Sequence, residues 1–256
     1  MDQRISHAAA SGFSVGADDY ERGRPSYPDD VVEVLCRELG IGPGRRVLDL
    51  AAGTGKLTRL LAATGAELVA VEPVEEMRAH LVATAPGVEV LDGTAEAIPL
   101  PDRSIDAVTV AQAFHWFDLE PALAEIARVL RPGGGLGLVW NERDDTVGWV
   151  AELSRMIRWD RRGEHRVPYT IERDWTAEIE AVDSPFGSVG EHRTTHRQPV
   201  DADTLVARVL STSYLASLPD EERDALAVDV RALVADLGPT FDLPYRTVAY
   251  WCHLPT

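Results

Sequence analysis

The sequence is poor in cysteine and has no long apolar stretch. Its 256 residues include only two cysteines, Cys36 and Cys252, which are far apart and lack the spacing of a metal or redox motif. No apolar run is long enough to span a bilayer, and residues 1–19 lack the charged-then-apolar pattern of a secretory signal. We therefore expect a cytoplasmic protein that binds no metal and does not enter a membrane.

Basic residues are also scarce. Lysine and arginine together number 25, against 42 aspartates and glutamates, which gives a formal net charge of −17. A nucleic-acid-binding protein needs a basic face to displace counterions from phosphates, so we expect no nucleic-acid partner. The same balance disfavours polyanionic substrates, although a single pocket can differ from the whole molecule. The oligomeric state is not indicated by any pattern in the chain.

Residues 47–61 predict a buried strand, a glycine turn and a helix in direct succession. Residues 47–50 are mostly apolar, and leucines at helical spacing follow the turn. Between them, Gly53 and Gly55 allow backbone conformations and a close ligand approach that a Cβ atom would block. Asp49 lies inside the end of the strand, just before the glycines. This arrangement is typical of a site for a nucleotide cofactor.

Two other kinds of glycine loop fit these residues less well. A phosphate-binding loop requires a glycine at the place of Leu50 and a serine or threonine at the place of Leu57. A dinucleotide-binding loop requires a third glycine, and Thr58 occupies that place. A nicotinamide-dependent oxidoreductase is therefore the weaker alternative, and it stays open.

The next hundred residues predict an α/β fold. Strands are expected at residues 67–72, 88–92, 106–112 and up to Trp140, with single helices between them. This alternation implies a parallel sheet with helices on both faces. Glu72 ends the second of these strands, where a carboxylate accepts hydrogen bonds from ribose hydroxyls in doubly wound folds.

In their order along the chain, these motifs resemble those of the class I S-adenosylmethionine (SAM)-dependent methyltransferases. Motif I of that family is acid-x-Gly-x-Gly-x-Gly, and residues 49–55 match it with Ala51 in place of the first glycine. Residues 93–102 resemble the family's adenine loop, with Thr94 where an acid usually precedes the alanine. A threonine oxygen can still accept a hydrogen bond from the adenine amino group.

Residues 20–28 resemble the Tyr-x-x-x-Arg-Pro-x-Tyr-Pro segment of the ubiquinone-type and trans-aconitate-like methyltransferase branch, where it lies over the cofactor. The resemblance implies an N-terminal lid, with Arg24 near the methionine carboxylate and Tyr20 as a rigid wall. The alternative is that the two prolines of this segment only start a helix at residues 29–39, which ends at Gly40.

The expected fold is a Rossmann-like, doubly wound, mostly parallel seven-stranded α/β sheet with helices on both faces, an N-terminal lid segment and a helical insertion before the sixth strand. We expect a single methyltransferase domain over residues 1–256. Its parts are the lid and first helix (1–40), the cofactor-binding core (41–140), the insertion that shapes the acceptor pocket (141–190) and the end of the sheet (191–256).

Beyond Trp140 the sequence departs from the shared core. We expect an amphipathic helix within residues 146–160, a strand at 189–200, helical segments over 202–237 and a final strand at 246–253. The tryptophans of the insertion either line the acceptor pocket or belong to the core, and the second is more common.

The resemblance also implies the residues of the site. The predicted cofactor-binding residues are Tyr20, Arg24, Asp49, Ala51, Gly53, Thr54, Gly55, Glu72, Pro73, Thr94, Ala95, Glu96, Ala111 and Gln112. The predicted substrate-binding residues are Tyr20, His115, Trp116, Trp140 and Asn141. His115 is the candidate catalytic base, with packing beside Trp116 as the alternative.

The predicted activity is transfer of the methyl group of SAM to a small-molecule acceptor by in-line displacement, which leaves S-adenosyl-L-homocysteine (SAH). The acceptor atom, whether O, N, S or C, is open. A methyltransferase-like fold that binds SAM for a cyclase or lyase reaction is the other alternative, because fold does not fix chemistry.

Two further patterns are set aside. Residues 12–16 match the glycine-x-serine-x-glycine motif of hydrolases, but no strand leads into them. His192 and His196 have a spacing that could bind a metal, but a third ligand is missing. We expect both histidines to be exposed on a strand.

Overall fold

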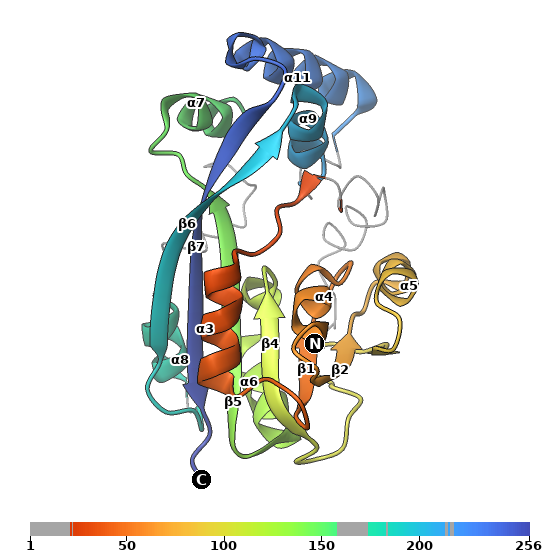
Figure 1. Ribbon diagram of the computed structural model, residues 1–256, viewed down its shortest axis with the longest axis vertical. Coiled ribbons are helices and arrows are strands. Elements are labelled where there is room, and N and C mark those ends of the chain that lie inside the picture. Colours follow the sequence, from red (N-terminus) through yellow and green to blue (C-terminus); the bar gives the residue numbers. More distant parts are fainter. Residues whose placement is uncertain (1–20, 22, 158–173, 183, 213–214, 216–217) are drawn as a thin grey trace. The chain divides into compact units, whose positions relative to one another are not determined.

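Figure 1 shows the computed structural model of the chain, which describes residues 21, 23–157, 174–182, 184–212, 215 and 218–256. The helices are α3 (Asp29–Leu39), α4 (Lys56–Ala62), α5 (Glu75–Thr84), α6 (Leu119–Val129), α7 (Gly148–Met156), α8 (Trp175–Ala181), α9 (Ala202–Leu210) and α11 (Asp220–Leu233), with 3-10 turns η1 (Phe114–Trp116) and η3 (Ala235–Leu237). The strands are β1 (Arg46–Leu50), β2 (Glu67–Val71), β3 (Glu89–Leu91), β4 (Ile105–Ala111), β5 (Leu130–Arg143), β6 (Gly190–Val200) and β7 (Phe241–His253).

The strands form one seven-stranded sheet in the order β3-β2-β1-β4-β5-β7-β6. The five strands from β3 to β5 pair in parallel, and the arrow of β7 points opposite to that of β5 (Figure 1). The order reverses between β1 and β4, and ligands of doubly wound folds bind at the carboxyl ends of the strands beside such a reversal. The predicted mostly parallel, seven-stranded sheet is confirmed.

Alternate residues of the central strands pack against helices on opposite faces of the sheet. On one face, Val47 of β1 packs in a cluster with residues of α3 and α4. On the other face, Leu48 packs in a cluster with residues of α6 and α8. A strand covered on both sides must be apolar at nearly every position, which explains the continuous apolar run that marked β1 in the sequence.

The bounds of most elements agree with the prediction. The helix α3 ends where expected, because Gly40 adopts a left-handed conformation (φ 65°) and its N–H bonds to the carbonyl of Cys36. The last strand was predicted to begin at Arg246, but β7 begins at Phe241. A proline has no N–H to donate to a neighbouring strand, but the carbonyl of Pro244 accepts the N–H of Asp144 at 2.9 Å, so the strand extends past it.

The contacts within the chain group it into two compact units. The larger unit comprises Ser26–Asn141, Tyr169–Thr194 and Thr247–Thr256, and the smaller unit comprises Met1–Pro25, Glu142–Pro168 and Thr195–Arg246. The prediction of one domain over the whole chain is not tested by this grouping and stays a prediction. Each unit is described separately below.

The smaller unit has its own hydrophobic cluster. Residues of α7, α9 and α11 pack there with Val200 of β6 and with Leu243 and Tyr245 of β7. The helices α7, α9 and α11 fall in the ranges 146–160 and 202–237, where helical segments were expected. Among the described residues, no helix has the length and apolar character needed to cross a membrane.

Candidate functional site

The loop that follows β1 has the conformation that the glycine pattern predicted. Gly53 (φ 58°) and Gly55 (φ 84°) are left-handed, and so is Ala51 (φ 56°), which stands where the family pattern has its first glycine. A Cβ added at Gly53 would meet no atom within 4 Å. The loop therefore leaves open space directly above Gly53, as a cradle for a bound nucleotide requires.

Glu72 joins the end of β2 to this loop. Its Oε2 accepts the N–H of Gly53 at 2.8 Å, and its Oε1 accepts the N–H of Val74 at 2.9 Å. The residue is only 5% exposed, and burial raises the pKa of its carboxyl group. Each carboxylate oxygen can accept more than one hydrogen bond, so both oxygens can still accept from a pair of ribose hydroxyls.

Asp49 is fully buried under the loop. Its Oδ2 accepts the hydroxyl of Thr58 at 2.5 Å and its Oδ1 accepts the hydroxyl of Thr109 at 3.2 Å. Burial raises the pKa of this carboxyl to about 6, against the lowering effect of the two threonine hydroxyls. Asp49 therefore ties the start of α4 to the centre of the sheet, and its predicted contact with the cofactor stays a prediction.

The predicted adenine loop is held in place from α6. The guanidinium of Arg128 donates to the carbonyls of Ile98 and Leu100, both within 2.9 Å, and pairs with Asp102. Within the loop, Ala95 is buried, and Thr94 forms an isolated bridge with residue 97. A loop fixed by three bonds from one arginine is ready to receive a planar base without first ordering itself.

Glu96 of the same loop is bonded to the backbone at the start of α6. Its Oε1 accepts the N–H of Asp118 at 3.0 Å, which connects the loop to the start of α6. The remaining predicted residues of the cradle are Thr54, which is buried, and Pro73, which follows Glu72 directly.

The carboxyl end of β4 carries the predicted Ala111 and Gln112. Gln112 has a left-handed backbone (φ 59°), which is uncommon for a residue other than glycine and concentrates at functional sites. Its side-chain amide donates to the carbonyl of Asn141 at 2.9 Å. Asn141 in turn donates to the carbonyl of Ser26 and accepts the hydroxyl of Thr247. Protein groups thus occupy both side-chain atoms of Asn141, whose predicted substrate contact is untested.

His115 and Trp116 form the short turn η1 just beyond β4. Their rings lie 4.8 Å apart, and Trp116 is 47% exposed. The Nε1–H of Trp140 donates to Nδ1 of His115 over a long 3.5 Å contact. Trp140 itself is buried and stacks on Trp175 at 4.7 Å. Trp140 therefore belongs to the core, and it presents one polar atom to the candidate catalytic residue.

The N-terminal segment is only partly described. Tyr20 lies outside the described residues. Arg24 is half-buried and belongs to the smaller unit, whereas the glycine loop belongs to the larger one. The lid and the role of Arg24 at the methionine carboxylate therefore stay predictions.

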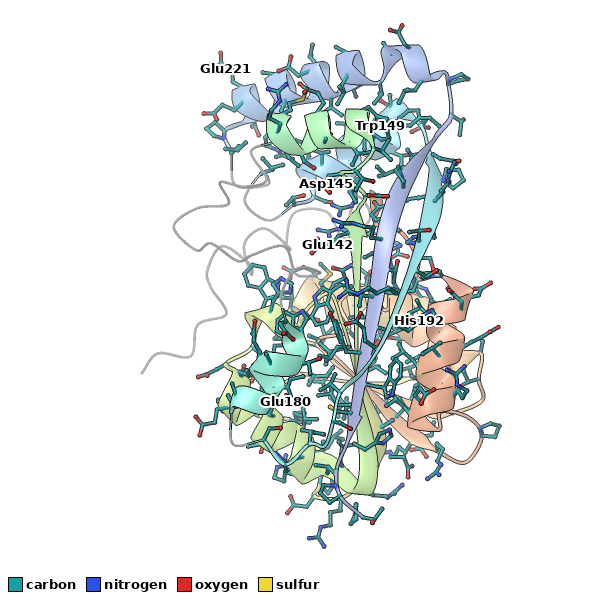
Figure 2. The ribbon with its side chains drawn as sticks, turned by 90° about the vertical axis from the view of Figure 1, so that its left-hand side faces the viewer. Glu142, Asp145, Trp149, Glu180, His192 and Glu221 are labelled. Atoms are coloured by element: carbon teal, nitrogen blue, oxygen red, sulfur yellow. The ribbon has the colours of Figure 1, made fainter. Side chains whose placement is uncertain are left out.

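The two strand histidines are only partly exposed and have different surroundings. Figure 2 shows His192 on β6, and its Nε2 lies 3.4 Å from Oδ2 of Asp30 on α3. The ring of His196 stacks on Tyr245 at 5.2 Å. Within the described part of the chain, no group of three potential metal ligands occurs.

Sequence reasoning missed the partners of Asp49. Thr58 attracted attention only as the missing third glycine, and Thr109 is one polar residue in an apolar strand. A threonine at a fully buried strand position needs a hydrogen-bond partner, and that rule would have identified Thr109. Arg208 was also missed, because an arginine in an amphipathic helix is normally exposed, whereas this one is buried.

The glycine loop with open space above it, the carboxylate after β2 and the order of the sheet are together the features of an enzyme that binds a nucleotide cofactor. Residues 48–138 match the family described as a methyltransferase domain. A protein of Mycobacterium tuberculosis named as an uncharacterized methyltransferase is 44% identical over 242 residues, which cover 93% of this chain and 92% of the relative.

Two solved structures share the fold. A proposed type II methyltransferase from Anaeromyxobacter dehalogenans is 23% identical and gives a TM-score of 0.64, covering 91% of this chain and 99% of that one. Phosphoethanolamine N-methyltransferase 2 of Haemonchus contortus, solved with phosphomonomethylethanolamine and SAH, is 14% identical with a TM-score of 0.58, covering 98% of this chain and 58% of that one.

The chain belongs to the SAM-dependent methyltransferase family, and its cofactor is SAM. The residues of the loop fit this cofactor, because the space above Gly53 is open and Glu72 is anchored beside it. The predicted class of enzyme is confirmed, and the nicotinamide-dependent alternative is set aside.

Proposed function

We propose that this methyltransferase acts on a small-molecule acceptor by in-line displacement, as a member of the ubiquinone-type and trans-aconitate-like branch. The main support for the proposal is the hydrogen bonding just beyond the carboxyl end of β4. There the side chains of Gln112 and His115 are each hydrogen-bonded to a residue of β5. The acidic character of the chain supports a small molecule over a nucleic acid.

The residues of the cradle bind and orient the cofactor in this proposal. Glu72 accepts hydrogen bonds from the ribose hydroxyls, and the left-handed loop at Gly53 lets the backbone approach the ligand closely. Ala95 and Thr94 contact the adenine. Bound SAM supplies an electrophilic methyl group, so the protein mainly has to align the acceptor and exclude water, and alignment can contribute roughly 7 to 11 kcal/mol.

His115 contacts the acceptor in this proposal. The indole N–H of Trp140 donates to Nδ1 of His115, and a neutral imidazole that accepts at Nδ1 carries its proton on Nε2. This tautomer favours His115 as a hydrogen-bond donor that orients an acceptor oxygen or nitrogen. A base at Nε2 requires the other tautomer, and therefore the loss of the Trp140 contact.

Two substitutions separate the donor from the base. His115→Asn keeps a side-chain N–H, whereas His115→Ala removes it. A donor role predicts that the asparagine variant retains far more turnover than the alanine variant, which loses about 100-fold. Equal losses in both variants, with a wild-type pH–rate limb near the ordinary pKa of histidine, would establish the base instead.

Release of SAH tests the activity itself. Purified protein is incubated with SAM and a panel of thiol, phenol, amine and carboxylate acceptors, and SAH is measured. SAH formed only with one acceptor class supports the proposal. SAM converted without an acceptor and without a methylated product would point to the cyclase or lyase alternative.

A further inference from the structure

A buried arginine of the smaller unit has no counter-charge among the residues that the structure describes. Arg208 lies near the end of α9 and is 4% exposed. Its Nε and Nη1 atoms are buried without a hydrogen-bond partner among the described residues. The same residues include no carboxylate that pairs with it. An arginine side chain stays protonated in proteins, so its charge is buried without compensation.

This situation is unusual for a chain of this composition. Acidic residues outnumber basic ones by 42 to 25, so carboxylates are abundant. Other arginines of the smaller unit have them, since Arg197 pairs with Asp242 and Arg231 pairs with Asp203. A charge taken out of water needs a partner. The missing partner of Arg208 is therefore best supplied by a ligand.

A second buried polar group follows the end of the helix. The helical hydrogen bonds continue past the end of α9, from the N–H of Ser211 to the carbonyl of Ala207 at 3.0 Å. The N–H of Thr212 bonds to the carbonyl of Val209 at 3.0 Å, so the chain tightens into a turn there. The Oγ1 of Thr212 is also buried without a partner among the described residues. The chain thus buries a guanidinium and a hydroxyl, each able to donate to an anion, within four residues of one another.

The backbone at Gly23 closes one side of this position. A Cβ added at Gly23 would lie 2.7 Å from the Cα of Arg208 and 3.2 Å from the carbonyl carbon of Ala207. The chain can therefore pass this close to α9 only because residue 23 is glycine. The segment at Gly23 therefore packs directly on the backbone of α9 at Arg208.

We infer that Arg208 and Thr212 of the smaller unit bind a small molecule that carries a carboxylate or phosphate group. The inference goes beyond the proposed function, because it assigns a ligand to the smaller unit. The smaller unit lies outside the residues that match the methyltransferase domain, so the shared cofactor-binding core does not account for this buried charge. A planar guanidinium matches both carboxylate and phosphate geometry.

The test uses the full chain saturated with SAH. Succinate, citrate and inorganic phosphate are titrated by calorimetry into wild type, Arg208→Gln, Arg208→Lys and Thr212→Val. Arg197→Gln is the matched control, because Arg197 is 75% exposed in the same unit. SAH affinity is measured in every variant. Comparison of the carboxylates with phosphate tells which anion the site prefers.

We expect at least one probe to bind wild type and the Arg197→Gln control equally. Arg208→Gln should weaken its binding about 10- to 100-fold, as loss of a charged hydrogen-bond donor does, and Arg208→Lys should weaken it less. SAH affinity should be unchanged throughout. Absence of probe binding to wild type, or equal binding to Arg208→Gln, would overturn the inference.

The SAH measurement keeps the two proposals apart. If SAH does not bind wild type, the proposed function fails. If SAH binds but the probes do not, only the anion site fails. If Arg208→Gln weakens SAH binding and leaves probe binding unchanged, the anion site is not at Arg208 and the inference is overturned.

A stability measurement covers the case of a variant that does not fold. Replacement of a buried, unpaired charge by an apolar side chain of similar length is neutral or stabilising. Arg208→Met should therefore melt at the wild-type temperature or above it, and the binding probe should raise the melting temperature of wild type but not of the variant. A lower melting temperature for Arg208→Met, or an equal shift with the probe, would contradict the site.

Discussion

The two units treat their buried polar groups in opposite ways. In the larger unit, the buried carboxylates of Asp49 and Glu72 are bonded by hydroxyls or backbone N–H groups. In the smaller unit, Arg208, Thr212 and Tyr245 bury polar atoms that have no partner among the described residues. Satisfied polar groups give a rigid, preorganised site. The larger unit is therefore suited to hold one invariant cofactor in a fixed cradle. The smaller unit is suited to a site whose polar groups find their partners only when a ligand binds.

The same contrast predicts that the larger unit is built for affinity for the cofactor and the smaller unit for specificity toward its ligand. The cradle is held by Glu72 and its loop by Arg128 before any cofactor arrives, so binding orders few groups. The buried guanidinium of Arg208 gives specificity, because a ligand without an anionic group would leave this positive charge unpaired. The predictions below test the contrast, and the largest effect comes first.

The buried acid of the larger unit should dominate the pH dependence of stability. Burial raises the pKa of Asp49 from 3.8 to about 6, so the folded protein binds this proton more tightly than the unfolded chain. The contribution is fully present below about pH 4 and is lost as the pH rises through about 6. Two pKa units correspond to about 3 kcal/mol.

Asp49→Asn removes this titration. We expect the difference in unfolding free energy, variant minus wild type, to move by about 3 kcal/mol in favour of the variant between pH 4 and 7. Urea denaturation at a series of pH values measures it. Parallel pH profiles for the two proteins would show that Asp49 titrates normally.

Loss of the Glu72 carboxylate should weaken cofactor binding next. In Glu72→Ala, the ribose hydroxyls and the N–H groups of Gly53 and Val74 lose their acceptor, at a cost of about 1 to 3 kcal/mol. Calorimetry with SAH should therefore show a roughly 5- to 150-fold weaker affinity. The control Glu76→Ala changes an exposed carboxylate of α5 and should bind as wild type does. An unchanged affinity in Glu72→Ala would remove Glu72 from the site.

The strained alanine of the loop should give a smaller effect of opposite sign. Ala51 is left-handed, which costs a residue with a Cβ roughly 1 to 2 kcal/mol, while glycine raises the entropy of the unfolded chain by less. Ala51→Gly should raise the unfolding free energy by about 0.5 to 1 kcal/mol. Ala124→Gly, at an exposed position in the middle of helix α6, should lower it by about 1 kcal/mol. Equal signs for the two changes would mean that the loop is not strained.

The fold was predictable because its signals are local. The glycine turn after β1, the acid after β2 and the end of α3 at Gly40 each depend on a few neighbouring residues. The environment of Asp49 was not predictable in the same way, since Thr109 is 60 positions away. Gly23 packs on the backbone of Arg208 from 185 positions away, a contact that no periodicity within α9 encodes. Local patterns fix elements, whereas distant contacts decide which polar side chains are buried.

Two tyrosines of β7 give the smallest and most direct comparison. Tyr250 belongs to the larger unit and its hydroxyl accepts from Nη2 of Arg193 at 3.2 Å. Tyr245 belongs to the smaller unit, and its buried hydroxyl has no partner among the described residues. Tyr250→Phe should lower the unfolding free energy by about 1 kcal/mol, because it removes a hydrogen bond from a charged donor. Tyr245→Phe should change it by less than about 0.5 kcal/mol in either direction, since no bond is lost and an unsatisfied polar atom leaves the core.

Urea denaturation of both variants beside wild type measures the difference. Equal losses would mean that the hydroxyl of Tyr245 is satisfied after all, and the contrast between the two units would then rest on Arg208 and Thr212 alone.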